Sequence, residues 1–547
     1  MRRALLVVLA SSAALLAPAN AHAATTGRVL VTLEPQAGGT ASAASAAASA
    51  AARPDGPSVP ALRLVTVRPR QGTSVAATLR ALRADPRVRS ATPEQRFAPR
   101  ALPNDPALTL PDADKDAPAG TPLEWTLPRE GFAAAWNLSA GVGATVAVID
   151  SGVDASHPDL QGKIADAIDF DDVRPGPATV DPDGHGTHVA SLACASTNNA
   201  LGIAGAGRDC RLLVIRSDFS EGSIIAGLVA AAQRGAQAVN MSFGGGGASD
   251  PALGAALQYA VRHGAVPVAA AADEPVQDQG QPASMLQPAG TGPQLGRGLG
   301  LVVTAATAAG ARASFAGFGS EVSMAAYGTL TDGAKPHGII GAYPAGTTVR
   351  ETGGKDRKPC RCRATIGGDS RYAFLAGTSM AAPQVTGAAA LMRAVNPRLP
   401  VARVVGLLKS TARRPAGTGW NADLGWGILD AGAAVDAARR VDLLAPTSKA
   451  RATSPARGTR PRIRLRVRLK RSDPSPGALV ASGVRRVEVW ASRRGHGRHR
   501  IARTRKRSVR VRLAPGRYKL WSIAVDRAGN RERRPAKADV RLRVIRR

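Results

Sequence analysis

Three short segments of the chain supply a carboxylate, an imidazole and a hydroxyl. Asp150 follows an apolar run, His185 lies between two glycines, and Ser379 lies within Gly-Thr-Ser-Met-Ala-Ala-Pro. Together these groups can activate a serine: the imidazole takes the hydroxyl proton, and the carboxylate orients the imidazole. The residue types and their order along the chain therefore predict a nucleophilic serine site built from Asp150, His185 and Ser379.

The segments around these residues predict the elements that hold them. Residues 146–149 are apolar and predict a buried parallel strand, which places Asp150 at the carboxyl end, where functional groups gather in an open α/β sheet. Residues 188–195 predict a helix, with His185 at its N-terminal side. A second, Ala-rich helix is predicted from Ser379 to about residue 395. Its first N–H groups would face negative charge developing on a substrate.

These segments carry a family resemblance. Residues 120–442 resemble the catalytic domain of the subtilisin-like serine proteases (subtilases), whose triad follows the same order, Asp, His, Ser. Ser156-His-Pro-Asp-Leu and Gly425-Trp-Gly-Ile-Leu-Asp match further segments of that family. The resemblance implies an α/β fold, a parallel sheet with helices on both faces. It also implies a serine endopeptidase that forms an acyl-enzyme on Ser379.

The resemblance also implies binding residues. Asn240-Met-Ser-Phe-Gly-Gly resembles the family's substrate-pairing strand, so Ser242, Phe243 and Gly244 are expected to contact substrate. The stretch after the catalytic His helix resembles a calcium loop, and oxygen ligands suit Ca²⁺. The implied ligands are the side chains of Asp159 and Asn199 and the carbonyls of Thr197, Leu201 and Ile203. The alternative is an ordinary hydrogen-bonded turn.

One position departs from the family. Where subtilases have an oxyanion-hole Asn, the matching stretch Ala-Ala-Ala-Asp-Glu has Asp273, and an ionised carboxylate only accepts hydrogen bonds. In subtilisin itself, loss of that donor costs about 10²–10³ in turnover. Three interpretations stay open: a protonated Asp273 that donates its O–H, a slow, specialised or inactive protease, or a rebuilt loop in which Gln277 or Gln279 donates. The first predicts a narrow pH optimum, more acidic than that of Asp273→Asn.

The N-terminal region predicts export and maturation. Residues 1–23 read as a secretory signal peptide, with two arginines, an apolar run and a final Ala-His-Ala. No other stretch is apolar for the length of a membrane span. Residues 24–100 alternate strand and helix patterns and resemble the family's propeptide, a small α+β inhibitor and folding chaperone, although residues 41–52 are of low complexity and predict no packed element. Residues 101–119 predict a solvated linker that contains the maturation site.

Export permits disulfides. We expect Cys194 to pair with Cys210, across the calcium loop, and Cys360 to pair with Cys362. The stretch 328–371, rich in Gly, Lys and Arg, is longer than a subtilase needs and predicts a surface loop near the substrate cleft.

The last hundred residues have a different composition. Residues 447–547 hold 33 Lys and Arg against 5 Asp and Glu, a net charge of +28 out of the chain's +33. Residues 462–470 alternate Arg or Lys with apolar residues, which predicts a strand with one cationic face. Further strand patterns at 484–491, 509–513, 518–525 and 540–545 predict a small sandwich similar to immunoglobulin-like modules. Such a module would bind anionic wall polymers or other polyanions, unless its arginines only solvate the surface.

The sequence therefore predicts a secreted, monomeric serine endopeptidase, made as a self-processing zymogen inhibited by its own propeptide. Its substrates would be proteins or peptides, and its chemistry would need no cofactor. The alternative is a weakly active or non-catalytic surface-binding protein on the same scaffold, an interpretation motivated by Asp273.

Overall fold

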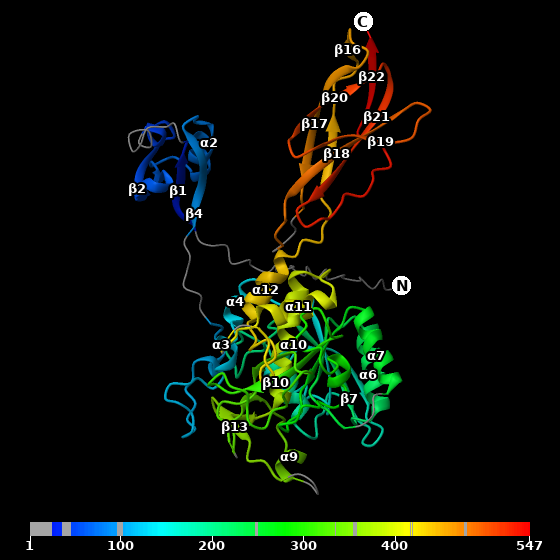
Figure 1. Ribbon diagram of the computed structural model, residues 1–547. Coiled ribbons are helices and arrows are strands. Elements are labelled where there is room, and N and C mark those ends of the chain that lie inside the picture. Colours follow the sequence, from blue (N-terminus) through cyan, green and yellow to red (C-terminus); the bar gives the residue numbers. More distant parts are fainter. Residues whose placement is uncertain are drawn as a thin grey trace, which may run out of the picture. The chain divides into compact units, whose positions relative to one another are not determined.

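The computed structural model describes residues 25–34, 45–95, 102–246, 250–333, 335–353, 358–415, 417, 419–474 and 479–546 (Figure 1). The chain divides into two compact units, residues 1–101 and 102–547. The predicted signal peptide, residues 1–23, lies outside the described residues. None of the helices in the described part of the chain is long and apolar enough to cross a membrane.

The first unit contains a four-stranded antiparallel sheet and a helix. The strands are β1 (Thr25–Leu33), β2 (Ala52–Val59), β3 (Leu64–Pro69) and β4 (Val88–Gln95), in the order β2-β3-β1-β4. Helix α2 (Val75–Ala84) begins after Ser74, whose hydroxyl accepts the Ala77 N–H at 3.1 Å. The expectation that residues 41–52 pack nowhere is wrong for the described part: residues 45–49 are helical, and Ala46, Ala47 and Ala50 are buried in this unit's core.

The second unit is built around a seven-stranded sheet in the order β11-β10-β9-β8-β5-β7-β6, with every neighbouring pair parallel. Its strands are β5 (Thr145–Asp150), β6 (Ile164–Phe170), β7 (Arg211–Ser217), β8 (Ala238–Met241), β9 (Val266–Ala270), β10 (Leu301–Ala306) and β11 (Met324–Tyr327). The inner strands are largely apolar and buried because both faces of the sheet are covered.

Helices cover the two faces of this sheet (Figure 1). In β5, Ala147 and Ile149 pack with α6 (Glu221–Gln233) and α7 (Pro251–Arg262), whereas Val146 and Val148 pack with α5 (His185–Cys194). Helices α10 (Thr378–Val395), α11 (Val401–Thr411) and α12 (Ala431–Arg440) share a core with β9 and β10 on that second side. The predicted α/β fold with helices on both faces is thus confirmed. Short helices complete the unit: α3 (Thr126–Arg129), α4 (Phe132–Trp136), α8 (Ala283–Leu286), and the 3-10 turns η2 (Pro106–Leu108) and η3 (Pro158–Leu160).

Two predicted loops are more ordered than expected. Residues 328–371 do not form a simple surface loop, because they contribute β12 (Ile339–Ala342), β13 (Arg363–Ile366), α9 (Val349–Thr352) and part of β14 (Asp369–Leu375), and the three strands form a sheet in the order β12-β14-β13. We call residues 339–375 the insertion sheet. The linker prediction for 101–119 is also wrong in part: Ala107 and Leu108 are buried, and Asp112 Oδ2 lies 2.6 Å from His337 Nε2.

Residues 447–546 form two sheets around one apolar core. One sheet has the order β15-β17-β20, with β15 (Thr447–Arg451), β17 (Ile463–Ser472) and β20 (Ser508–Leu513). The other has the order β16-β22-β21-β18-β19, with β16 (Ala456–Gly458), β18 (Val484–Arg493), β19 (His499–Thr504), β21 (Gly516–Asp526) and β22 (Val540–Arg546). The five strands expected here are present, and the immunoglobulin-like assignment stays a prediction.

Candidate active site

Asp150 and His185 meet at the carboxyl end of the central sheet. Asp150 is the last residue of β5 and is 1% exposed; His185 opens α5 and is 8% exposed. Their contact joins Asp150 Oδ1 and His185 Nδ1 at 2.8 Å. Because a carboxylate can only accept, Nδ1 carries the proton and the unprotonated Nε2 is left to act as a base.

Ser379 lies in the first turn of α10 and is tied to the end of β8. Its hydroxyl donates to the Ser242 carbonyl at 3.0 Å, and the Ser242 hydroxyl donates to the Ser379 carbonyl at 2.9 Å. The nucleophile must therefore rotate away from Ser242 before its proton can pass to a base, and substrate-free sites often show such loose geometry. Of the three predicted substrate contacts, Ser242 therefore touches the nucleophile directly, and Phe243 and Gly244 follow it in the chain.

A buried carboxylate that the sequence analysis missed orders the turn before His185. Asp181 is 4% exposed and accepts from the Ser151 hydroxyl at 2.9 Å, the Gly184 N–H at 2.9 Å and the Thr187 N–H at 2.8 Å. Burial raises the pKa of Asp181, while these hydrogen bonds act in the opposite direction. A carboxylate with several backbone and hydroxyl donors can stay ionised inside a protein. Asp181 thus positions the loop that delivers the imidazole. The sequence offers Asp181 only as one polar residue among several in a turn.

The insertion sheet braces the same turn. Gly184 has φ +89°, and a Cβ on it would lie 2.5 Å from the ring of Tyr343, so only glycine fits between the turn and this buried tyrosine. Arg350 Nε contacts Asp183 Oδ1 at 2.6 Å, and the Val349 N–H donates to the Pro182 carbonyl at 2.9 Å. The residues predicted as a loop near the cleft therefore support the catalytic histidine's turn.

The second histidine of the motif, His188, has a structural role. Its Nε2 lies 3.0 Å from the Ile339 carbonyl and 3.1 Å from the Ala373 carbonyl, which makes it the donor. Full burial lowers the pKa of His188 to about 3, with a smaller contribution from the nearby His185. This neutral ring ties α5 to the insertion sheet.

Asp273 follows β9 and lies beside the start of α10. Its Oδ1 accepts from the Thr378 N–H at 2.7 Å and from the Thr378 hydroxyl at 2.8 Å. The side chain is exposed, so the desolvated setting considered for a protonated Asp273 is not found without substrate. In the described part of the chain, Asp273 acts as an acceptor that holds the N-terminus of the nucleophile's helix.

Gln279 does not serve as a substitute oxyanion donor. It is 2% exposed, and its amide NH₂ donates to the carbonyls of Val276, Gln277 and Phe318 at 2.9–3.0 Å. Its Oε1 accepts the Ala272 N–H at 3.1 Å. The Gln279 amide thus has all its hydrogen bonds within the chain and has no N–H left for a substrate. The interpretation in which Gln279 donates to the oxyanion is therefore wrong. The Gln277 side chain is exposed, and a Cβ on Gly319 would lie 3.3 Å from it.

The predicted calcium residues surround one buried carboxylate. Asp159 is fully buried, and it accepts from the Asn199 amide at 3.2 Å, the Ile203 N–H at 3.1 Å and the Tyr372 hydroxyl at 3.0 Å. Asn199 Oδ1 accepts the Leu201 N–H at 3.0 Å. Thr197 bonds instead within the loop, through its hydroxyl and the Gly205 N–H at 3.0 Å.

Two acidic residues absent from the predicted ligand set lie close to this loop. Asp105 is 1% exposed and accepts the N–H groups of Asn198 and Asn199 at 2.8–3.3 Å. Burial raises its pKa, and the charge of Asp159 adds to that rise. Glu124 is buried, one of its oxygens has no partner among the described residues, and burial holds its pKa well above normal. Each lies far from the loop in sequence, so spacing gave no sign of them.

Both predicted disulfides are present. Cys194 and Cys210 bridge at a Cα–Cα distance of 5.7 Å, and Cys360 and Cys362 bridge at 5.2 Å. The first pair is fully buried and joins the end of α5 to the start of β7.

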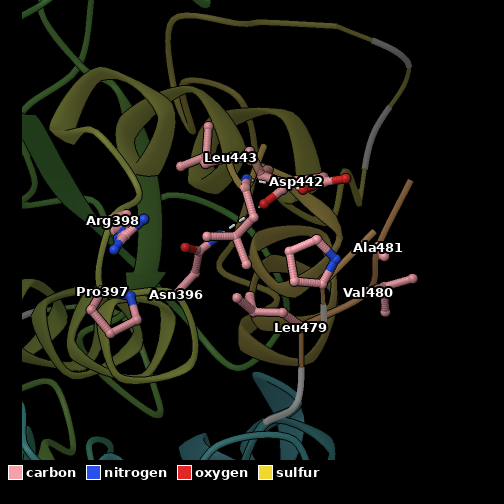
Figure 2. Close-up of a pocket in the computed structure, with 11 residues that line it drawn as sticks. Asn396, Pro397, Arg398, Asp442, Leu443, Leu479, Val480 and Ala481 are labelled. Carbon is pink, nitrogen blue, oxygen red and sulfur yellow. Dashed lines mark hydrogen bonds between the residues drawn. The ribbon is translucent and has the colours of Figure 1, made fainter. Parts of the chain in front are cut away.

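A pocket of about 190 Å³ lies at the other end of α10 (Figure 2). It is lined by residues 396–398 after the helix, by 441–444 and by 474 and 479–481. Since an 18-residue helix is about 27 Å long, this pocket lies far from Ser379. Its apolar lining is formed largely by segments that lead into or belong to the C-terminal sheets, and it takes no part in the site described above.

The chain is similar in sequence and fold to known proteins. The Subtilase family matches residues 141–427, more than half of the chain. An extracellular protease of Xanthomonas campestris is 30% identical over 399 residues, covering 65% of this chain and 60% of that protein. Thermitase of Thermoactinomyces vulgaris is 31% identical over 290 residues, covering 52% and 86%. Among solved structures, a protease of Pseudoalteromonas arctica is 26% identical with a TM-score of 0.47, covering 62% of this chain and 100% of that one.

The chain thus spans about three fifths of the length of the Xanthomonas relative and most of thermitase. The family match includes the segments of Asp150, His185 and Ser379, and it confirms the resemblance predicted from the sequence. This chain belongs to the subtilase family.

Proposed function

We propose that the protein is a secreted serine endopeptidase that uses Asp150, His185 and Ser379. The observation that carries this proposal is the buried 2.8 Å contact between Asp150 and His185 Nδ1 at the sheet edge where α10 presents Ser379. The Ser379 hydroxyl attacks a peptide carbonyl, and His185 Nε2 takes its proton and passes it to the leaving amine. Asp150 holds the ring and stabilises its charged form, and water then hydrolyses the acyl-enzyme.

The substrate lies along the segment after β8. Ser242 contacts the nucleophile and Phe243 and Gly244 follow it in the chain. Gly244 has no heavy atom of a neighbour closer than 3.7 Å to the position of a Cβ, so a substrate backbone can approach there. The exposed Asp273 carboxylate beside α10 makes the protein a slow enzyme at neutral pH. The same carboxylate is the observation that favours the alternative function. In that case the protein is a weakly active or non-catalytic surface-binding protein on this scaffold.

The test is direct. The full chain and its Ser379→Ala and His185→Ala variants are expressed with export, and both removal of residues 24–100 and hydrolysis of a peptide library are measured. Wild type is expected to process itself and hydrolyse peptides, whereas both variants stay unprocessed and inactive. Processing in the variants, or an inactive wild type, would refute the proposed self-processing protease and favour the alternative.

We also propose a structural calcium ion in the loop of residues 197–203. Asp159 and Asp105 are buried carboxylates for which the described residues show no ion pair. Burial, with a smaller contribution from the charge of Asp159, raises the pKa of Asp105, and a cation beside both carboxylates would favour their charged forms. Both would serve as ligands, as would Asn199 after its amide turns, and carbonyls of the loop. A bound Ca²⁺ would stiffen the loop and supply no chemistry.

Thermal unfolding with and without a chelator tests the calcium proposal. A ligand present at about 100 times its Kd stabilises by about 2.7 kcal/mol, so the Tm should fall on chelation and recover with Ca²⁺. Asp159→Asn should remove this response, whereas Glu274→Gln, which changes an exposed carboxylate elsewhere, should keep it. A Tm that is indifferent to the chelator in wild type would support the hydrogen-bonded turn instead.

A further inference from the structure

The sheet β15-β17-β20 presents one face that carries only positive charge. The exposed cations on it, which we call the cationic face, are Lys449, Arg451, Arg464, Arg466, Arg468, Lys470, Arg510 and Arg512. The alternate residues of β17, Ile463, Leu465, Val467 and Leu469, are buried in the core between the two sheets. Because strand side chains alternate, the basic residues are forced onto a single outer surface.

The strand register places these cations directly opposite one another. Arg464 pairs with Arg512 and Arg466 with Arg510 across β17 and β20, and β15 and β17 set Lys449 against Lys470 and Arg451 against Arg468. Like charges in such cross-strand pairs are destabilising. Among the described residues, no carboxylate forms a salt bridge with any member of the cationic face, so this repulsion is not relieved within the chain.

The five acidic residues of the C-terminal region are engaged elsewhere. Glu488 contacts arginines of the other sheet, including Arg531 at 2.8 Å. Glu532 and Asp539 accept backbone N–H groups of β15 and β21, and Asp473 and Asp526 accept N–H groups at turns. A surface built for solubility alone would mix the two signs. Here the acidic residues bond within the region and the basic residues share one exposed face. This arrangement favours binding of an anion from outside the chain.

The composition of the face selects the kind of anion. Six of its eight cations are arginines, whose planar fork binds phosphate oxygens in a bidentate manner. Neighbours on one strand are about 6.8 Å apart and adjacent strands about 4.8 Å apart, so the cations form a regular array suited to an extended polymer.

The face has no aromatic side chain for stacking. Trp490 and Trp521 belong to the other sheet, where Arg534 and Arg498 lie over their rings at 5.6 and 3.8 Å. Binding of single-stranded nucleic acid relies on stacking platforms of this kind, and their absence from the face disfavours such a partner. We propose that the cationic face binds a linear, base-free phosphate polymer, such as a polyol-phosphate chain, independently of the peptidase site.

The test uses the full chain carrying Ser379→Ala, with long-chain inorganic polyphosphate as the probe and affinity measured over a salt series. With about eight phosphates neutralised and a slope of about 0.7 per phosphate, Kd should rise roughly 10³-fold between about 50 and 200 mM salt. The variant Arg464→Gln, Arg466→Gln, Arg510→Gln, Arg512→Gln should lower the slope of log Kd against log salt by about 3.

A matched control removes four exposed arginines outside the face. It carries Arg485→Gln, Arg494→Gln, Arg503→Gln and Arg533→Gln and has the same net charge as the test variant. It should keep nearly the wild-type affinity and Tm, whereas the test variant, which removes the cross-strand repulsion, should have a Tm at or above that of wild type. Equal weakening in both variants, or equally tight binding of polyglutamate or tighter binding of DNA than of polyphosphate, would overturn the proposal. None of these outcomes depends on whether the protein is a protease.

Discussion

Replacing Asp273 by Asn is expected to accelerate peptide hydrolysis at neutral pH by about 10²–10³, or about 2.7–4 kcal/mol of transition-state stabilisation. The Thr378 N–H and hydroxyl both donate to Asp273 Oδ1, at 2.7 and 2.8 Å. These donors would orient an Asn with its carbonyl oxygen toward Thr378. The NH₂ group would then take the place of Oδ2, which accepts no hydrogen bond among the described residues. The substitution therefore adds a fixed donor and removes a negative charge where the oxyanion would form.

The assay measures kcat and KM for one peptide substrate between about pH 5 and 9. The gain should appear in kcat with little change in KM, because the new hydrogen bond forms only in the transition state. Glu274→Gln is the matched control, since it removes a neighbouring exposed charge without adding a donor at residue 273. If Asp273→Asn left both rate and pH profile unchanged, residue 273 would not face the oxyanion.

Two further substitutions test how the site is supported. Removing the buried disulfide with Cys194→Ala and Cys210→Ala should lower the free energy of unfolding by about 3 kcal/mol, the value for a loop of roughly 15 residues. Urea melts measure this change. An unchanged midpoint would show that the loop is already ordered by other contacts. Gly184→Ala should lower both stability and kcat, because its Cβ would lie 2.5 Å from the Tyr343 ring at a φ of +89°. An unchanged Tm and kcat in Gly184→Ala would contradict this.

The sequence predicted the parts of the molecule that depend on local pattern. The apolar run 146–149 became a central parallel strand because strands covered on both faces are apolar throughout, and the Ala-rich run after Ser379 became α10. The faultless alternation of 463–470 gave β17, with its buried and exposed residues in the expected order. The pairs of cysteines were also predicted correctly.

Long-range contacts between polar residues were beyond the sequence. Asp181 and Asp105 look like turn residues, and only folding shows that Asp181 accepts the distant Ser151 hydroxyl and that Asp105 accepts the N–H groups of Asn198 and Asn199. The stretch 328–371 looks like a loop because Gly and Arg are frequent in it. Its order comes from two buried tyrosines, Tyr343 and Tyr372, which contact residues far away in sequence. A single chain gives no signal for such contacts.

Buried ionisable groups outside the triad give the fold an unusual pH dependence. Burial raises the pKa of Glu130 from 4.5 to about 8 and lowers that of His188 from 6.5 to about 3. Glu130 contributes stability below pH 4.5 that is lost as pH rises toward 8, while His188 contributes stability that is lost as pH falls from 6.5 toward 3. The two effects oppose each other up to about pH 6.5. Above pH 6.5 the stability contributed by His188 no longer changes. Glu130 should then lower the free energy of unfolding by about 2 kcal/mol between pH 6.5 and 8.

Two buried lysines reverse the trend above pH 8. Burial lowers the pKa of Lys163 and Lys409 from 10.5 to about 8, so each costs stability that is regained as pH rises from 8 toward 10.5. The free energy of unfolding should therefore pass through a minimum near pH 8. Glu130→Gln keeps an oxygen to accept the Tyr327 N–H at 2.9 Å but cannot ionise, so in urea melts this variant should lose about 2 kcal/mol less than wild type between pH 6.5 and 8. A decline as steep as that of wild type would mean that Glu130 is already ionised in the folded protein.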